Sequence, residues 1–253
     1  SLDGSTWTTI ATDATTPSAN IIYFRGCATG TKSLYTDSAN TNAWTFTGST
    51  NLECNGKLDR LIQNTLGDDN NVSTIGNYCF AYIFYNVFSL ISVDDGFLPA
   101  VTLTNSCYYG MFYGCRGLTT SPVLPATTLQ SSCYQSMFYG CTNLTTAPVL
   151  PATTLAANCY YSMFNGCTSL TVAPVLPATT LANYCYQSMF YGCTKIKLST
   201  TLTGIYDTAY RIPTTGTGIT ATDALKSMFT ATGGTFKGTS EINTTYYTEN
   251  TLV

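Results

Sequence analysis

The chain has 253 residues, with 13 acidic and 10 basic side chains, and only 9% of its residues are charged, against about 25% in an ordinary soluble domain. It contains 48 threonines, 19 tyrosines and 11 cysteines but no histidine, which excludes Ser-His-Asp and Cys-His catalysis and His-ligated zinc. Ten basic residues, outnumbered by the acidic ones, do not provide the positive charge that binding to nucleic acid or an anionic membrane requires. A hydrophobic content of 44% is too high for a disordered chain. The composition therefore favours an ordered, non-enzymatic binding protein that needs no cofactor or metal.

The first residues carry neither the basic nor the apolar region of a signal peptide, so none is expected in this chain. A trimmed product would look the same, so this says nothing against an extracellular origin. The most apolar run covers residues 78–93, and its 16 residues fall short of the roughly 20 that span a bilayer. We predict no membrane span and interpret this run as a buried turn of a repeat array.

Residues 1–71 are rich in Thr, Asn and Gly, with strand-like runs at 21–24 and 44–47. The array that follows needs a cover for its exposed apolar end, so we interpret residues 1–71 as an N-terminal β-rich cap. An interaction module of its own is the alternative. Cys27 and Cys54 are the one pair that suggests a disulfide bridge.

Residues 72–201 are organised as a repeat. Four copies follow one another without a gap in a 26-residue period, and they begin at Leu98, Leu124, Leu150 and Leu176. A degenerate copy precedes them, in which Cys79 matches Cys107. The sequence Ser227-Met228-Phe229 echoes Ser188-Met189-Phe190 at a spacing of one and a half periods. Residues 202–253 are accordingly interpreted as a degenerate C-terminal repeat and cap.

Each copy contains the pattern Cys-Tyr-x-x-Met-Phe-x-x-Cys, as in Cys107–Cys115. At about 100° per residue the recurring positions fall on one apolar arc, which predicts a short amphipathic helix. The two positions on the opposite side should then form a solvent-exposed ridge. Its residues are Tyr109, Tyr113, Gln135, Tyr139, Tyr161, Asn165, Gln187 and Tyr191.

The rest of the unit contains two prolines, which exclude a helix interior, and leucines that suit short extended segments. One such unit cannot bury its apolar side alone, whereas stacked units can. We therefore predict an α/β repeat solenoid, similar to a leucine-rich repeat, with short strands and one short helix per 26-residue coil. A row of threonines, Thr119, Thr145 and Thr171, is expected on the face opposite the ridge.

The motifs L-T-x-x-P-V-L-P, the following T-L and M-F-x-G-C resemble those of the BspA-type leucine-rich repeat proteins on the surface of gut and oral anaerobes. The resemblance is close over residues 72–201. It implies a secreted or cell-surface adhesive protein whose partner is a host extracellular protein or glycan. The family also occurs in phage and mobile-element genes, and it supplies no catalytic residues.

Eight cysteines belong to the repeats: Cys107, Cys115, Cys133, Cys141, Cys159, Cys167, Cys185 and Cys193. The ends of a two-turn helix lie about 12 Å apart, too far for a disulfide within one repeat, and the odd total argues against a complete disulfide framework. We therefore expect a structural ladder of buried free thiols, although neighbouring coils are close enough in principle for bridges.

Two further motifs have ordinary structural interpretations. LPATT at Leu124, Leu150 and Leu176 resembles a sortase signal, but it is internal, repeats with the coil and lacks the required glycine. The pairs Asp68-Asp69 and Asp94-Asp95 lack the alternating ligands of a calcium loop and are expected to be solvated turn residues.

These observations support two hypotheses. The first is an extracellular or cell-surface binding protein with an uncharged Tyr/Thr/Asn surface, a composition typical of binding surfaces. The second is a structural component of a phage virion or extracellular filament, in which self-assembly of copies occurs. An enzyme is disfavoured because glycoside hydrolysis needs two facing carboxylates, and Arg116 is the only charged residue in 98–193.

Overall fold

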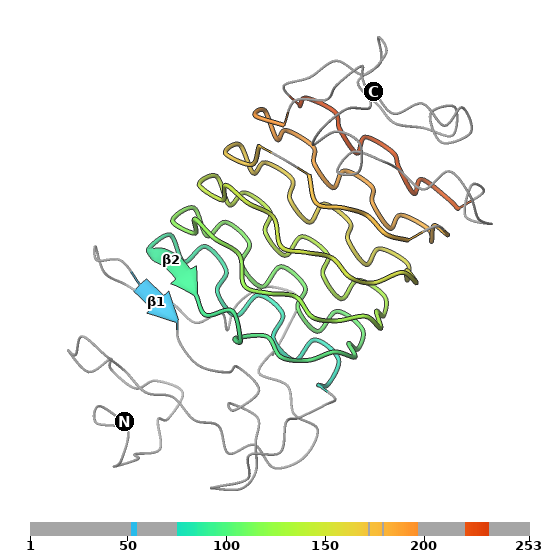
Figure 1. The fold of residues 1–253 in the computed structure, drawn as a ribbon, viewed down its shortest axis with the longest axis horizontal. Coiled ribbons are helices and arrows are strands. Elements are labelled where there is room, and N and C mark those ends of the chain that lie inside the picture. Colours follow the sequence, from blue (N-terminus) through green and yellow to red (C-terminus); the bar gives the residue numbers. More distant parts are fainter. Residues whose placement is uncertain (1–51, 55–74, 172, 179, 197–220, 233–253) are drawn as a thin grey trace, which may run out of the picture.

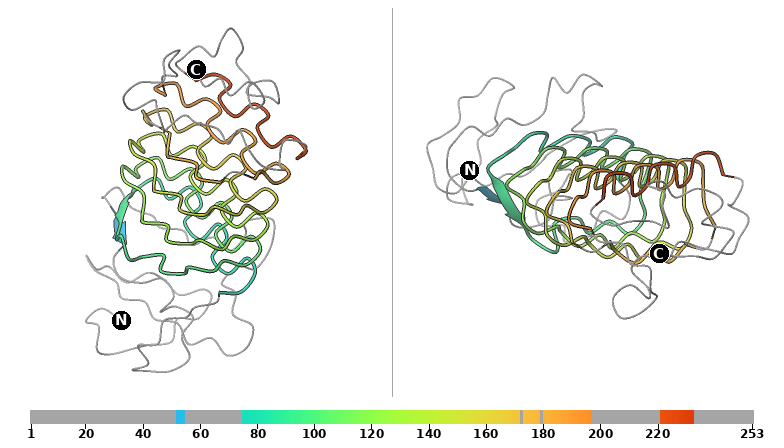
Figure 2. Two further views of the ribbon diagram at one scale, coloured as in Figure 1. Left: turned by 45° about the vertical axis from the view of Figure 1, so that its right-hand side comes forward. Right: turned by 90° about the horizontal axis from the view of Figure 1, so that it is seen from above.

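The computed structural model describes residues 52–54, 75–171, 173–178, 180–196 and 221–232. In these ranges the chain winds into coils of similar outline that stack side by side along one axis (Figure 1). Figure 2 shows the same stack from two further directions. The described residues thus form a repeat solenoid, as the 26-residue period predicts.

One part of each coil is a succession of tight turns that we call a turn ribbon. In residues 104–115 every second N–H group, from Cys107 to Cys115, donates to the carbonyl three residues earlier, at N···O distances between 2.9 and 3.4 Å. The same pattern recurs in each coil. Numbered in chain order as ribbons 1 to 6, the described turn ribbons cover residues 76–87, 104–115, 130–141, 156–167, 182–193 and 221–232.

The remaining N–H groups of a ribbon bind the next ribbon. Tyr108 donates its N–H to the Cys133 carbonyl at 3.0 Å, and Phe112 donates to the Met137 carbonyl at 2.9 Å. Five such bonds cross each of the five junctions between described ribbons, always from a ribbon to the one that follows it in the chain. Backbone pairing between coils therefore fixes their register.

Every fourth residue of a ribbon has a positive φ. In ribbon 2 these residues are Ser106, Gly110 and Gly114, with φ of 54°, 54° and 70°. A positive φ at the third residue of a turn is the geometry of a type II turn, and Gly adopts it without strain. The side chains consequently alternate two inward and two outward along the ribbon.

The prediction of a short helix over Cys107–Cys115 is wrong, because no segment of the described residues is helical. The inward positions follow a period of four, and over nine residues this period selects the same positions as the 3.6-residue period of a helix. The burial pattern is therefore as expected, while the backbone that produces it is different. The helix-length argument against disulfides within a repeat does not apply to this backbone.

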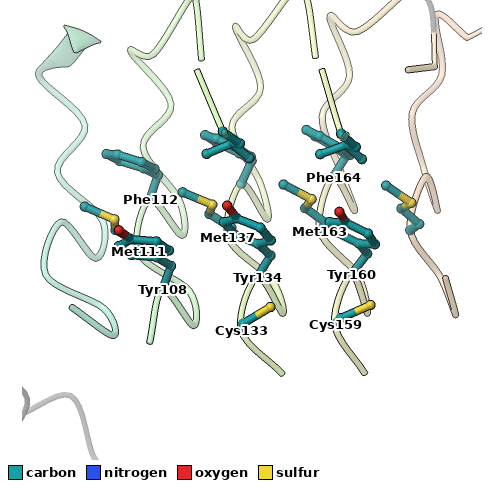
Figure 3. Packing of buried hydrophobic residues seen from close by; sticks show 14 of the residues in the cluster. Tyr108, Met111, Phe112, Cys133, Tyr134, Met137, Cys159, Tyr160, Met163 and Phe164 are labelled. Atoms are coloured by element: carbon teal, nitrogen blue, oxygen red, sulfur yellow. The ribbon is translucent and has the colours of Figure 1, made fainter. Parts of the chain in front are cut away.

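The core consists of columns in which a residue stacks on its equivalent in the next coil. Tyr108, Tyr134 and Tyr160 lie in one row and the methionines and phenylalanines in others (Figure 3). The phenylalanine column runs from Phe84 to Phe229 with ring centroids 5.2–5.7 Å apart. Stacked aromatic pairs contribute about 0.5–1.5 kcal/mol each beyond the burial of their area.

Extended segments complete each coil. Leu118, Leu124 and Leu129 point inward and are buried, and isolated parallel bridges join Thr102 to Thr128, Thr128 to Thr154 and Thr120 to Thr146. Two strands lie at the N-terminal end of the stack. Strand β1 (Leu52–Cys54) pairs in parallel with β2 (Leu90–Val93), with a register shift between Leu52 and Glu53.

Ribbon 6 contains Ser227-Met228-Phe229, the residues that echo the repeat sequence at one and a half periods. Tyr186 donates its N–H to the carbonyl of Ala224, which occupies the place of a repeat cysteine. Phe229 stacks on Phe190 with ring centroids 5.2 Å apart. The solenoid therefore continues past the longer interval between 193 and 221. Most of the predicted caps, 1–71 and 202–253, lies outside the described residues, and so does Cys27.

Gly117 is a position where only glycine fits. A Cβ there would clash with the backbone carbonyl oxygens of Phe88 and Leu90, so we expect Gly117→Ala to lower the free energy of unfolding by about 1–3 kcal/mol. Denaturant unfolding measures the change. Ser169 occupies the position equivalent to Gly117 two coils later. Ser169→Ala should change the free energy of unfolding by less than about 0.5 kcal/mol. Equal effects of the two substitutions would contradict this account.

Candidate binding surface

The outward residues of the turn ribbons form a surface that we call the tyrosine face. It has two columns, each with one residue per coil. The first column contains Tyr109, Gln135, Tyr161 and Gln187. The second contains Tyr85, Tyr113, Tyr139, Asn165 and Tyr191. All these side chains are half-buried except Tyr191, which is 41% exposed.

The second column begins with a run of stacked rings. Tyr85 and Tyr113 have ring centroids 5.1 Å apart, and Tyr113 and Tyr139 have centroids 4.5 Å apart with their planes only 2° from parallel. Asn165 interrupts the run before Tyr191. The first three coils thus present the edges of three stacked phenols.

The first column is held by edge contacts and a side-chain hydrogen bond. Tyr82 meets Tyr109 edge to face, with centroids 5.0 Å apart, and the Gln135 amide donates to the Tyr109 hydroxyl at 3.3 Å. Burial, followed by the neighbouring Tyr109 hydroxyl, raises the pKa of the Tyr82 phenol well above its ordinary value. Tyr82 therefore stays a neutral phenol over the physiological pH range.

Sequence reasoning identified the residues from Tyr109 onward but missed Tyr82 and Tyr85. Tyr85 precedes Tyr113 by the same spacing that relates Cys79 to Cys107, so this alignment already contained the signal. Tyr82 aligns with Gly110 and packs over it, which no repeat pattern predicts.

The predicted threonine row, Thr119, Thr145 and Thr171, is exposed and follows the ribbon in each coil. Thr145 donates both its N–H and its hydroxyl to the Thr119 carbonyl, each at 3.2 Å. Thr119 makes the same pair of bonds to Ile91. These hydroxyls support the stack, because they donate along it.

The eight repeat cysteines and Cys79 are buried, and they are not in disulfide bridges. In the second cysteine of each repeat the thiol donates to a phenylalanine carbonyl of the preceding coil, for example from Cys141 to Phe112 at 3.1 Å. Equivalent bonds join Cys115 to Phe84, Cys167 to Phe138 and Cys193 to Phe164. These thiols act as structural hydrogen-bond donors.

Burial also suppresses the reactivity of these thiols. It raises the pKa of Cys141 and Cys167 well above the ordinary value and raises the pKa of Cys185 and Cys193 to about 12. The thiolate, not the neutral thiol, is the nucleophile and the metal ligand. These buried cysteines are therefore unsuited to nucleophilic or metal chemistry.

Charged groups are peripheral among the described residues. Arg116 lies over the Phe88 ring at 5.2 Å, and Asp94 and Asp95 are exposed. No group of three or more Cys, Asp or Glu residues is placed to hold a metal ion in the ranges that the structure describes. Asp68 and Asp69 fall outside those ranges.

In the described part of the chain, no helix is long and apolar enough to cross a membrane.

No protein family, curated protein or solved structure matches this chain.

The hydroxyl of Tyr160 is buried without a hydrogen-bond partner among the described residues. Removing an unsatisfied buried hydroxyl removes its desolvation penalty, so Tyr160→Phe should leave the free energy of unfolding unchanged or raise it by up to about 1 kcal/mol. Phe80 already occupies this position in ribbon 1. Denaturant unfolding tests this, with Tyr160→Leu as the variant that breaks the ring stack and should destabilise. A loss above about 1 kcal/mol for Tyr160→Phe would show that its hydroxyl is satisfied.

The raised thiol pKa values predict loss of stability at high pH. Each folded-state pKa lies above the ordinary value of 9.0, so the stabilisation is complete below pH 9 and declines as the pH rises from 9 towards 12. Each thiol that ionises only on unfolding contributes up to about 1.4 kcal/mol per pH unit. Chemical denaturation at a series of pH values measures the slope.

Cys141→Ser is the matched variant for this experiment. Serine keeps a donor for the Phe112 carbonyl but does not titrate, so the slope above pH 9 should fall by about 1.4 kcal/mol per pH unit. An unchanged slope would show that Cys141 is not the source of a released proton.

Proposed function

We propose that this chain is a non-enzymatic binding or adhesion protein, secreted or displayed on a cell surface, whose tyrosine face recognises a host extracellular protein or glycan. The observation that carries the proposal is the tyrosine face itself, a regular surface of half-buried Tyr, Gln and Asn side chains on a backbone fixed by hydrogen bonds between coils. The resemblance of the repeat motifs to BspA-type surface proteins supports the same function.

The physical basis is contact area combined with hydrogen bonding. Tyr side chains supply large amphipathic contacts and lose little conformational entropy on binding, and stacking restrains Tyr113 and Tyr139 before any ligand arrives. A preorganised surface of this kind spends less free energy on ordering when it binds. Gln and Asn in the same columns add donors and acceptors that give direction to the contacts.

Electrostatic attraction has little part in this mechanism. Arg116 is the only charge between residues 98 and 193, and it lies over Phe88 rather than in the columns of the tyrosine face. Binding that rests on neutral contacts is only weakly screened by salt.

The test is a binding screen of the whole chain against a glycan array and a panel of purified extracellular-matrix proteins. The double variant Tyr139→Ser/Tyr161→Ser should weaken any specific interaction by about tenfold or more, as expected for central aromatic contacts. The affinity of the unmodified chain should change by less than about threefold between low and moderate salt.

Val149→Ser is the control, because Val149 is 78% exposed but belongs to an extended segment outside the tyrosine face. It should leave binding unchanged. Loss of affinity by orders of magnitude with salt, or equal loss in both variants, would contradict the proposal. Association only with further copies of the same chain, detected by sizing and scattering, would favour a structural component of a virion or filament.

A further inference from the structure

Tyr113 and Tyr139 form a close ring pair on the tyrosine face. Their centroids are 4.5 Å apart and their planes 2° from parallel, and each side chain is partly open to solvent. They belong to adjacent ribbons whose backbones are hydrogen-bonded at this point, since Gly114 donates to the Tyr139 carbonyl at 2.7 Å. Two oxidisable phenols are therefore held in contact.

We propose that Tyr113 and Tyr139 form a modification site, in which a one-electron oxidant such as a peroxidase with hydrogen peroxide joins them by an intramolecular dityrosine bond. The bond forms between the ring carbons ortho to the two hydroxyl groups. It links ribbon 2 covalently to ribbon 3. This inference does not depend on the proposed binding function.

The reaction balances with one peroxide per cross-link. Each phenol gives up one electron and its hydroxyl proton and becomes a neutral tyrosyl radical. The two radicals share their unpaired electrons in a new carbon–carbon bond, after which each ortho carbon loses its proton and each oxygen regains one. Two electrons and two protons leave in total, and they reduce one hydrogen peroxide to two molecules of water.

Proximity favours this pair over coupling between molecules, because a preformed contact replaces a bimolecular encounter and raises the effective concentration by orders of magnitude. The two rings also face each other, with planes 2° from parallel. Burial raises the pKa of Tyr113, and the neighbouring hydroxyls of Tyr139 and Tyr85 raise it further.

The other tyrosine pairs that the structure describes are less suited to the reaction. Tyr85 and Tyr113 are the nearest rival, but their centroids lie farther apart, at 5.1 Å, and their planes are 27° from parallel. The buried column of Tyr108, Tyr134, Tyr160 and Tyr186 has centroids 5.8–5.9 Å apart and no more than 2% exposure, so an oxidant in solution cannot reach it. Tyr82 and Tyr109 meet edge to face. Tyr191 is exposed, but Asn165 occupies the place of its nearest neighbour in the column.

The cross-link would strengthen the solenoid where it can otherwise open. Apart from the chain that links them, the described coils are held together by non-covalent contacts. In a solenoid each repeat contacts only its neighbours, so opening can begin at a single junction. A covalent bond across one junction prevents ribbons 2 and 3 from separating. Resistance of this kind suits a protein exposed to force or to proteases outside a cell.

The experiment oxidises the whole chain at high dilution with peroxidase and hydrogen peroxide. Dityrosine fluorescence gives the yield, and mass spectrometry of the digested monomer identifies the joined peptides. The expected result is a monomer lighter by two hydrogen atoms, with a main cross-link between the peptides that contain Tyr113 and Tyr139. Its yield should not change with protein concentration.

Three variants make the assignment specific. Tyr139→Phe keeps the stacked ring but removes the phenol, so this cross-link should disappear, whereas Tyr191→Phe should leave its yield unchanged. Asn165→Tyr should restore a continuous column and create new cross-links from position 165 to Tyr139 or Tyr191. A product dominated by another pair, cross-links only between molecules, or equal yields in Tyr139→Phe and Tyr191→Phe would overturn the proposal.

Discussion

The structure depends on the backbone hydrogen bonds between successive turn ribbons. Alternate N–H groups leave the ribbon and bind carbonyls of the next coil, five at each described junction, and each unpaired buried group would cost about 1–3 kcal/mol. A slip of one residue would break all five bonds at a junction and place some inward side chains beside outward ones. Register is thus set by the backbone, and every residue is placed beside its equivalent one period away.

This register decides which side chains the array can hold. A residue that stacks on its own copy must attract it, which Phe, Tyr, Met and Cys do as flat or polarisable groups. A charged residue would face its own charge one coil away. The scarcity of charge follows from this, since 22 of the 23 charged residues lie outside 98–193. The composition that first argued against catalysis is therefore a consequence of how the coils stack.

The period, the buried positions and the displaced copy at 221–232 are predictable from the sequence, because they depend only on which residues recur. The ribbon conformation was not predicted, because periods of four and 3.6 coincide over the nine residues from Cys107 to Cys115. The distinguishing signal is the small residue at every fourth position, Ser106, Gly110 and Gly114, since such residues are poor helix formers that accept positive φ. Tyr82 is the residue equivalent to Gly110 in ribbon 1, and it has a positive φ although it is large. The small-residue signal is therefore clear only when several copies are compared.

The backbone pairing limits where the coils can differ from one another. The peptide group between Cys107 and Tyr108 accepts a hydrogen bond from Phe80 and donates one to Cys133, so peptide groups line up head to tail along each column, as they do in a helix. The backbone is occupied with pairing and the inward side chains with stacking. Only the outward positions are left to vary between copies, and they do: Tyr109 is followed by Gln135, and Tyr139 by Asn165. Differences between coils within the ribbons are therefore carried by outward side chains.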